Sequence, residues 1–404
     1  MTQVSRWMDE MKKRAVSELS SLSLPKAEKT VIKHWNFEDL VLNDATGQPG
    51  VIPAAAAHLV KEDDANVIVV SDGTIVYSKL SDSYKDIVIS PIGEISETYF
   101  NLVQDYFFKA APYHANKLTA LNLINLNSGL FIYVPKNIIV EESLSVIYVQ
   151  ENRSLINHNL VVLGQSSEMK LVESYVNSGA AVLNLVSEVV VGENAKLDHA
   201  IMERLHKDVT AYNTKRVHVQ AHGRYDLSHG ALSDGDVVTE NLIGLVGEGA
   251  GSEVNVVAIA EQAQKQNVTV MIEHLAPNSE GNIINHGISQ DEAQLVFNGI
   301  GKIHKGMKGS NAEQESRVMI LSENARADAN PLLLIEEYDV MAGHAAGVGK
   351  IDEEQIYYMM SRGLSRREAE HLIIQGFLMP FIKEISNESV RDELTKTIQA
   401  KITA

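Results

Sequence analysis

Fourteen histidines are the side chains of this sequence best suited to binding a metal, and five of them lie close together in the chain. His218 and His222 would face the same side of a strand, with His229 downstream and His199 and His206 upstream. That spacing could serve a metal ion. Neither a His-Glu-x-x-His helix nor a carboxylate triad accompanies these residues, and Asp198 beside His199 adds no more, so polar positions in a sheet are the simpler interpretation.

A second candidate is His344, in the small-residue stretch that runs from Asp339 to Gly349. The stretch predicts a loop in which backbones can approach closely, and His344 is its only titratable side chain besides Asp339. Neutral imidazole is a good ligand for iron at physiological pH. A single histidine in a loop is more often structural, so the spacing alone assigns it no role.

The motifs of common enzyme classes are absent. Lys350 follows two glycines, but a phosphate-binding P-loop needs Ser or Thr after its lysine, and Ile351 stands there. A second glycine-rich stretch lacks dinucleotide-binding spacing, because Ser252 occupies the place of its last glycine. No Gly-x-Ser-x-Gly elbow occurs, and the adjacent Glu336 and Glu337 would point to opposite faces of a strand. We therefore expect no ATP hydrolysis by this chain.

Composition excludes further classes of function. The 404 residues are 45% hydrophobic, enough for a sizeable core, and a net charge of −18 makes nucleic acid and membrane surfaces poor partners. No cysteine is present, which excludes disulfides, zinc–thiolate sites, a cysteine nucleophile and an iron–sulfur cluster held by the chain's own thiolates. A signal segment and a membrane-spanning run are both lacking, so we expect a cytoplasmic protein.

The chain divides into three regions that differ in their predicted secondary structure, and these regions must position the candidate residues. Residues 1–128 mix helix and strand signals, with a helix over 6–22, two strands around a turn at 71–73, and a helix over 96–111. Residues 129–349 contain short Val- and Ile-rich runs separated by Gly, Asn, Ser or Asp. Such runs predict an all-β sandwich, barrel or β-helix, and no clean repeat distinguishes among these.

Residues 350–404 predict a helical tail. Asp352 begins a helix and Gly363 ends it, and Ser365 with Glu368 forms a capping box for the next helix. The second helix carries an apolar stripe, which must pack on the β region or on a partner.

A set of stretches, recognisable from Gly129 and dense from Asn311 onward, forms a family pattern. The stretches are Gly129–Pro135, Phe297–Gly299, Asn311–Ser322, Asn330–Ile335, Asp339–Val340, Ala342–Ala345, Asp352–Gln355, Ser361–Gly363 and Gly376–Leu378. Together they resemble the SufB/SufD family of iron–sulfur cluster assembly proteins. In its length and its lack of cysteine, the chain is similar to SufD rather than to SufB.

The resemblance implies a fold and a set of partners. It implies a right-handed parallel β-helix core at 129–349, between an N-terminal region of mixed α and β structure at 1–128 and a C-terminal helical domain at 350–404. A SufD-like, non-catalytic scaffold of the SUF system pairs with SufB through the β-helix and binds the ATPase SufC through its C-terminal helices. ATP-driven dimerisation of SufC would reshape the SufB–SufD interface, where clusters are assembled de novo.

The resemblance also maps the family's interface histidine onto His344. Ala342 stands where many members carry cysteine, so His344 would be the one ligand from this side, and SufB would supply thiolates. We expect no tightly bound cofactor, only a transient iron–sulfur cluster shared with SufB. Candidate contacts with SufC, which could equally pack the tail on the core, are Tyr358, Arg362, Leu372 and Phe377.

Two other functions stay open at this stage. A SufB-like chain that carries a cluster itself would need the cysteines that the sequence lacks. A β-helix carbohydrate enzyme would need clustered Asp or Glu on one face for general acid and base chemistry, and we can assign no such cluster. An isolated SufD-like chain is also expected to form a homodimer through the surface meant for SufB, because the two partners are similar in fold.

Overall fold

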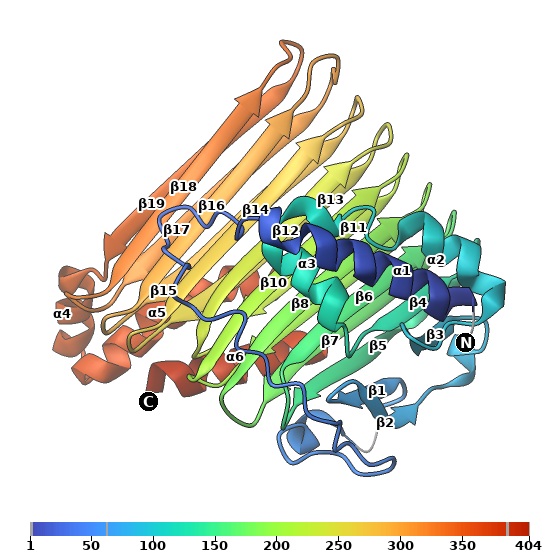
Figure 1. The fold of residues 1–404 in the computed structure, drawn as a ribbon. Helices are drawn as coiled ribbons and strands as arrows, with labels where there is room; N and C mark the ends of the chain where they lie inside the picture. Colours follow the sequence, from blue (N-terminus) through green and yellow to red (C-terminus); the bar gives the residue numbers. More distant parts are fainter. Residues whose placement is uncertain (1–2, 62–63, 385–387, 404) are drawn as a thin grey trace.

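The structure, a computed structural model, describes residues 3–61, 64–384 and 388–403. Long strands wind through its centre, with helices at both ends of the chain (Figure 1). The helices are α1 Gln3–Glu18, α2 Phe100–Tyr106, α3 Lys117–Asn125, α4 Glu353–Ser361, α5 Arg366–Glu384 and α6 Glu388–Thr403. The strands are β1 Val67–Ser71, β2 Thr74–Lys79, β3 Val88–Pro91, β4 Leu130–Val134, β5 Ile139–Gln150, β6 Leu155–Leu163, β7 Glu168–Asn177, β8 Ala181–Val191, β9 Lys196–Arg204, β10 Val209–Val219, β11 Arg224–Ala231, β12 Asp236–Leu245, β13 Gly251–Ala260, β14 Lys265–His274, β15 Glu280–Ser289, β16 Gln294–Ile303, β17 Asn311–Ile320, β18 Arg326–Ile335 and β19 Met341–Lys350.

Successive strands from β4 onward alternate between two parallel sheets. Sheet A contains the odd-numbered strands from β5 to β19, and sheet B contains the even-numbered strands from β4 to β18, which makes a solenoid of about 8 turns. In sheet A, Gly251 pairs with Glu280, Glu280 with Asn311, and Asn311 with Met341, so each strand lies one turn above the last. The predicted parallel β-helix is confirmed, and the sandwich and barrel alternatives are not.

The core lies between the two sheets. Because side chains alternate along a strand, every second residue points inward, and residues in register stack from turn to turn. Leu227, Val254 and Ile283 form one such stack, and each is at most 1% exposed. Burial of such apolar ladders stabilises the solenoid by about 25 cal/mol for each Å² removed from water.

One corner of each turn is held by a residue in the left-handed region of backbone conformation. These residues recur about every 28 positions, at Asn137, Ser166, Asn194, His222, Gly249, Asn278 and Gly309. Each donates its backbone N–H to a carbonyl of the next turn, as His222 does to Glu248 and Asn278 does to Lys308. His222 therefore lies in a corner, whereas His218 lies on β10, and the predicted shared face of these two histidines is wrong.

The N-terminal region extends both sheets. β1 and β2 form the hairpin predicted around 71–73, and β1 continues sheet A in parallel beside β5. β3 continues sheet B antiparallel to β4. α1 confirms the first predicted helix, and α3 begins with a capping box in which Asn116 and Thr119 satisfy each other's backbone N–H groups.

The helix predicted over 96–111 is only partly correct. A short 3-10 turn leads into α2, which ends at Tyr106. Phe108 then takes a φ of +56°, and the N–H groups of Phe108 and Ala111 donate to the carboxylate of Glu188 on β8. These bonds to a buried anion replace the bonds that a continued helix would have made.

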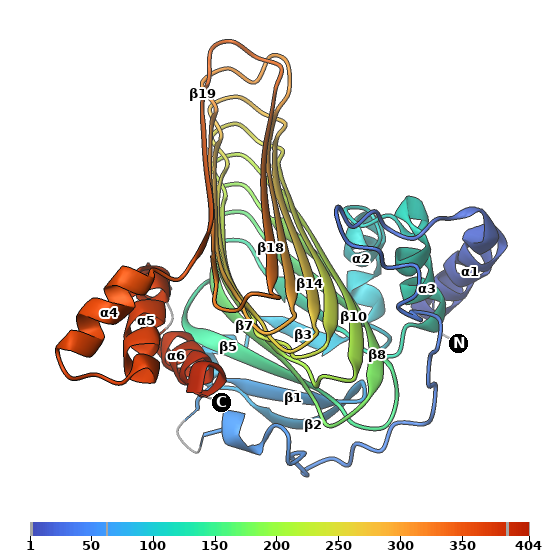
Figure 2. The same ribbon diagram turned by 90° about the vertical axis from the view of Figure 1, so that its left-hand side faces the viewer.

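Residues 22–61, here called the strap, run along the outer face of sheet B and on to the hairpin of β1 and β2 (Figures 1 and 2). Trp35 of the strap packs in a cluster with Tyr212 of β10. Lys29 forms a 2.6 Å ion pair with Asp328 of β18. The strap therefore contacts both the middle and the last turn of the solenoid.

The helical tail follows β19 and lies on the outer face of sheet A (Figure 2). The predicted caps are confirmed: the Asp352 side chain accepts backbone N–H groups of the first turn of α4, and Ser365 and Glu368 cap α5 reciprocally. Gly363, at φ +98°, ends α4 in a conformation that favours glycine. Within the described ranges of the chain, no helix combines the length and the apolar character that crossing a membrane requires.

Candidate functional site

The last turn of the solenoid is an open end. β18 and β19 are the last strands of sheet B and sheet A (Figure 1). Every residue of β19 is exposed, and those of β18 are exposed or only partly buried. Several apolar side chains are exposed at this end of the solenoid. They include Leu334 at 46% exposure, Met341 at 65% and Val348 at 43%.

The backbone of β19 offers a second feature, a free strand edge. The N–H of Met341 donates to Ser310 and that of Ile351 to Ile320, so the odd-numbered residues of this segment bond toward β17. In a parallel ladder the intervening residues direct N–H and C=O to the opposite side. Ala342, His344 and Ala346 therefore present their backbone groups to the open edge, where another strand can pair.

His344 lies on this edge strand. The prediction of a loop between Asp339 and Gly349 is wrong, because residues 341–350 pair with β17 throughout. His344 is exposed and stands in register with Gln314, whose amide donates to the carbonyl of Leu332 across the interior. The imidazole therefore lies on the interior side of sheet A, above the last covered turn.

The described residues do not form a metal site around His344 of the kind that three side-chain ligands would make. Within the ranges that the structure describes, no group of three His, Asp or Glu side chains could hold a metal ion. The five histidines that cluster in the sequence do not share one face of the structure. His199 and His229 are buried inside the solenoid, His206 is exposed, and His218 points outward from β10.

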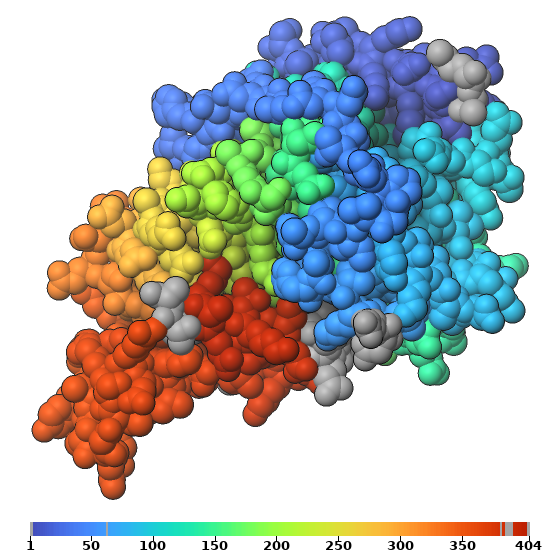
Figure 3. All heavy atoms as spheres, turned by 90° about the horizontal axis from the view of Figure 1, so that it is seen from below, coloured from blue at the N-terminus to red at the C-terminus, as the bar shows by residue number. Residues whose placement is uncertain are grey.

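The four tail residues expected at a partner surface divide into two groups. Tyr358 and Leu372 are exposed by 58% and 47%, and Arg362 lies over the Tyr358 ring at 5.2 Å, so these three remain at the surface. Phe377 instead turns toward sheet A, where its ring lies 5.1 Å from that of His286 on β15. α4 projects from the body of the molecule (Figure 3).

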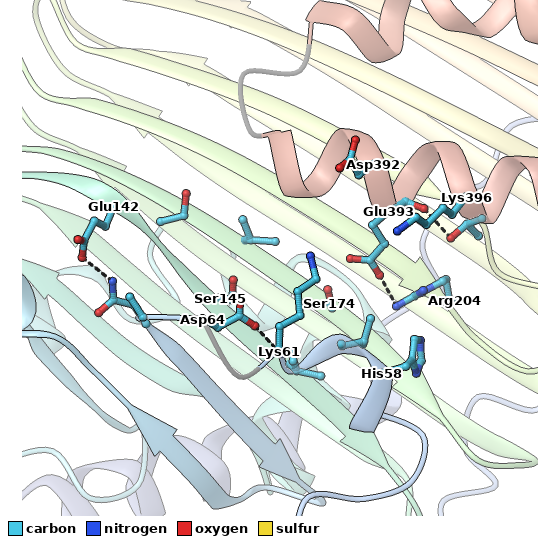
Figure 4. Close-up of a pocket in the computed structure, with 17 residues that line it drawn as sticks. His58, Lys61, Asp64, Glu142, Ser145, Ser174, Arg204, Asp392, Glu393 and Lys396 are labelled. Atoms are coloured by element: carbon cyan, nitrogen blue, oxygen red, sulfur yellow. Dashed lines mark hydrogen bonds and ion pairs between the residues drawn. The ribbon is translucent and has the colours of Figure 1, made fainter.

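α6 anchors the tail on sheet A. Leu394 is 1% exposed and packs over Gly230 of β11, where a Cβ would lie only 3.2 Å from its methyl group. Glu393 forms a 2.6 Å ion pair with Arg204, and Lys401 lies 2.8 Å from Glu261. Figure 4 shows the Arg204 pair at the wall of a groove between α6 and sheet A.

This groove has a volume of about 590 Å³ and is mixed in charge. Its charged lining residues, besides His58, are Lys61, Asp64, Glu142, Arg204, Asp392, Glu393 and Lys396. Several of the acids are already engaged: Glu142 accepts from Asn66, Ser81 and Ser83, and Glu393 pairs with Arg204. The arrangement favours no single class of ligand.

A buried acid–base cluster inside the solenoid was not predicted. Glu173 lies 3.0 Å from His199 and 4.0 Å from the ammonium of Lys215, and all three are nearly inaccessible. Burial raises the pKa of the Glu173 carboxyl, but its hydrogen bond and charge contact with His199 and the charge of Lys215 outweigh this and hold that pKa below its usual value. Burial also lowers the pKa of His199 and of Lys215.

An apolar layer separates this cluster from the open end. Val254 and Val256 of β13 face Val268 and Val270 of β14 in the core, and each is at most 2% exposed. The cluster is therefore sealed, and its carboxylates cannot reach an external substrate. It compensates its own charges within the core.

Comparisons with known proteins agree with this architecture. Residues 146–377 match the family model described as SUF system FeS cluster assembly, SufBD core domain, and residues 56–146 match the SufBD protein N-terminal region. The chain is 38% identical over 411 aligned positions to the iron–sulfur cluster assembly protein SufD of Bacillus subtilis, covering 98% of this chain and 94% of the relative. It is 28% identical to an iron–sulfur cluster assembly SufBD family protein of Staphylococcus saprophyticus, covering 78% of this chain and 70% of the relative. The chain therefore belongs to the SufBD family of iron–sulfur cluster assembly proteins, and within that family it is SufD-like.

Proposed function

We propose that this chain is a non-catalytic scaffold subunit of the SUF system, which pairs with SufB through the open end and binds SufC through the C-terminal helices. The observation that carries the proposal is the last turn, where a free strand edge and exposed apolar side chains occur together. A second solenoid of the same family would suit such a surface by presenting the free strand edge of its own last turn. Pairing would bury the apolar side chains and satisfy the backbone groups of β19.

His344 is the side chain that we assign to the cluster, which is cargo of the assembly. The small residues Ala342 and Ala346 share its face of β19 and leave space around the imidazole. Because the chain has no cysteine, the thiolate ligands would come from SufB. A site built from both subunits exists only while they are paired, so we expect any cluster on this chain to be transient.

α4 and α5 form the surface that we assign to SufC. Tyr358, Arg362 and Leu372 present an aromatic, cationic and aliphatic surface on these helices. Phe377 connects α5 to His286 of β15, and β15 pairs with β17, which pairs with β19. A displacement of α5 by an ATP-driven partner would therefore reach the edge that carries His344 through two strand pairings.

The same features argue against the alternatives. A SufB-like role with a cluster of its own is not supported, because thiolate ligands are lacking. A carbohydrate enzyme is not supported either, because the acids of the solenoid cluster are sealed inside. Without SufB, the open edge would pair with a second copy of this chain to form a homodimer. We also propose a cytoplasmic location for the assembly.

Cluster reconstitution in the purified complex tests the proposal. We expect His344→Ala to leave the complex intact by size-exclusion chromatography and to lower the yield of cluster several-fold, measured by visible absorbance and iron content. His34→Ala, at an exposed position on the strap, is the matched control and should leave the yield unchanged. A normal yield from an intact His344→Ala complex would overturn the ligand role.

A further inference from the structure

A second groove lies at the other end of the molecule, beside the N-terminal helices. It has a volume of about 360 Å³ and lies between α1 and the segment that follows α2. Its apolar lining comes from Trp7, Met11, Phe107, Phe108 and Tyr113. Trp7 lies 5.9 Å from Phe107 and Phe108 lies 6.5 Å from Tyr113, so the wall is a continuous aromatic surface.

The two charged residues that line this groove, Arg14 and Lys109, are both basic and exposed, and His114 also lines it. Glu18 interacts with the Tyr113 hydroxyl at the rim, and the charge of Arg14 acts on the same hydroxyl. In a chain with a net charge of −18, an aromatic groove rimmed by cations is a local exception and attracts anions.

The floor of the groove is held by a buried polar pair of the solenoid. Phe108 takes a φ of +56°, a conformation that bulky side chains rarely adopt. The carboxylate of Glu188 accepts the N–H groups of Phe108 and Ala111, and it also lies 2.9 Å from His158. Neither Glu188 nor His158 is exposed. The rings of Phe107 and Phe108 pack on the His158 ring at 4.4 and 4.3 Å.

A strained residue persists only where its surroundings hold it in place, and such residues concentrate at binding sites. Here the N–H of Phe108 donates to the buried carboxylate of Glu188, the N–H of Ala111 donates to the same carboxylate, and the edge-on ring of His158 packs against the Phe108 ring. The groove is therefore preformed rather than a chance gap between side chains. A preformed site avoids part of the ordering cost of binding.

We infer that this groove binds an acidic peptide segment of a partner protein that carries an aromatic or long aliphatic anchor residue. The anchor would pack against the aromatic wall formed by Trp7, Phe108 and Tyr113, and the flanking carboxylates would pair with Arg14 and Lys109. The volume suits one or two side chains. α1 and α2, next to which the groove lies, are beside the first strands of sheet B and at the opposite end of the solenoid from β19 (Figures 1 and 2), so the groove stays accessible when the open end is occupied.

Calorimetric titration of the full chain tests this inference without any other subunit. The probe is the peptide acetyl-Asp-Glu-Phe-Leu-Asp-Glu-amide, with two controls in which Lys replaces the acids or Ala replaces Phe and Leu. We expect the probe to bind at least tenfold more tightly than either control, and to weaken as salt rises. Arg14→Gln and Lys109→Gln should each reduce its affinity several-fold, while Lys13→Gln, exposed on α1, should not.

The two tryptophans provide a second readout. Trp7 lies in the groove and Trp35, a strap residue, is buried against sheet B, so the probe should change the fluorescence of Trp7 and leave a Trp7→Phe variant silent. Equal binding of the lysine peptide would overturn the inference, as would unchanged affinity in Arg14→Gln and Lys109→Gln. If phenylacetate bound as tightly as the peptide, the inferred peptide ligand would be wrong and the groove would be a site for small aromatic anions. Each of these outcomes is independent of cluster assembly.

Discussion

His286 provides a pH-dependent test of how the tail is held on the solenoid. It is 2% exposed on β15, beneath Phe377 of α5. Burial, and then the nearby charge of Arg317, lower the pKa of His286 to about 3. Glu315 lies 3.4 Å from the ring but is engaged by Arg317 at 2.7 Å, so it does not restore the usual value. The folded state therefore holds this imidazole neutral.

The sign and size of the effect follow from linkage. In the unfolded chain His286 has a pKa of 6.5 and binds a proton below that pH, whereas in the folded chain it stays neutral. The stability that this difference contributes is therefore present above pH 6.5 and is lost as the pH falls below it. Between pH 7 and pH 5 the loss from His286 is about 2 kcal/mol. His274, whose pKa burial lowers to about 4, adds a loss of about the same size over that range.

Urea unfolding at pH 7, 6 and 5 measures this directly. In His286→Gln the titration is removed, so the difference in unfolding free energy between pH 7 and pH 5 should shrink by about 2 kcal/mol relative to the parent chain. His34→Gln, at an exposed site, is the control and should keep the parent slope. If His286→Gln and the parent chain lose stability in parallel from pH 7 to pH 5, the reasoning is refuted.

Three further changes test other parts of the structure. Leu394→Ala should lower the unfolding free energy by about 2–4 kcal/mol through lost packing, and amide hydrogen exchange should become faster in α6 but not in the strands. Faster exchange throughout the chain would contradict the idea that α6 is held on sheet A independently of the solenoid. Ala346→Pro removes an N–H that faces the open edge and should block pairing with a second chain while thermal stability holds. Ala345→Pro removes one that bonds toward β17 and should destabilise the fold; identical behaviour of the two variants would refute the edge assignment. Glu173→Gln removes one of the two buried carboxylates, with Glu203, that offset the charge of Lys215, and should lower the unfolding free energy by up to about 3–5 kcal/mol, whereas an unchanged melting curve would show that the Glu173–Lys215 pair carries no such charge.

Local signals in the sequence predicted what local chemistry determines. The hairpin at 71–73, the caps at Asp352 and Ser365, and the end of α4 at Gly363 all depend on residues that are neighbours in the chain. The solenoid repeat was missed for a different reason. Its periodic feature is a left-handed corner about every 28 residues, and Asn, Ser, His and Gly all occupy that corner, so the repeat lies in backbone conformation more than in residue type.

β19 was predicted as a loop because alanine and glycine have little tendency to form strands. Hydrogen bonds to the preformed edge of β17 outweigh that tendency. The cluster of Glu173, His199 and Lys215 was missed because its members come from different turns, and continuous apolar runs do not show which residues face inward. The small-residue stretch around His344 marked it as a candidate, and the family resemblance suggested its role. Only the structure could show that it lies on an open strand edge.

Co-purification of the tagged chain with SufB and SufC, compared with its Ala346→Pro variant, tests the central claim most directly. The account predicts that the parent chain recovers both partners. It predicts that Ala346→Pro loses SufB and retains SufC, because the strand edge and the helical tail are separate surfaces. Recovery of the chain alone, or only as a homodimer when both partners are co-expressed, would contradict the scaffold proposal, and retention of SufB by Ala346→Pro would contradict pairing through β19.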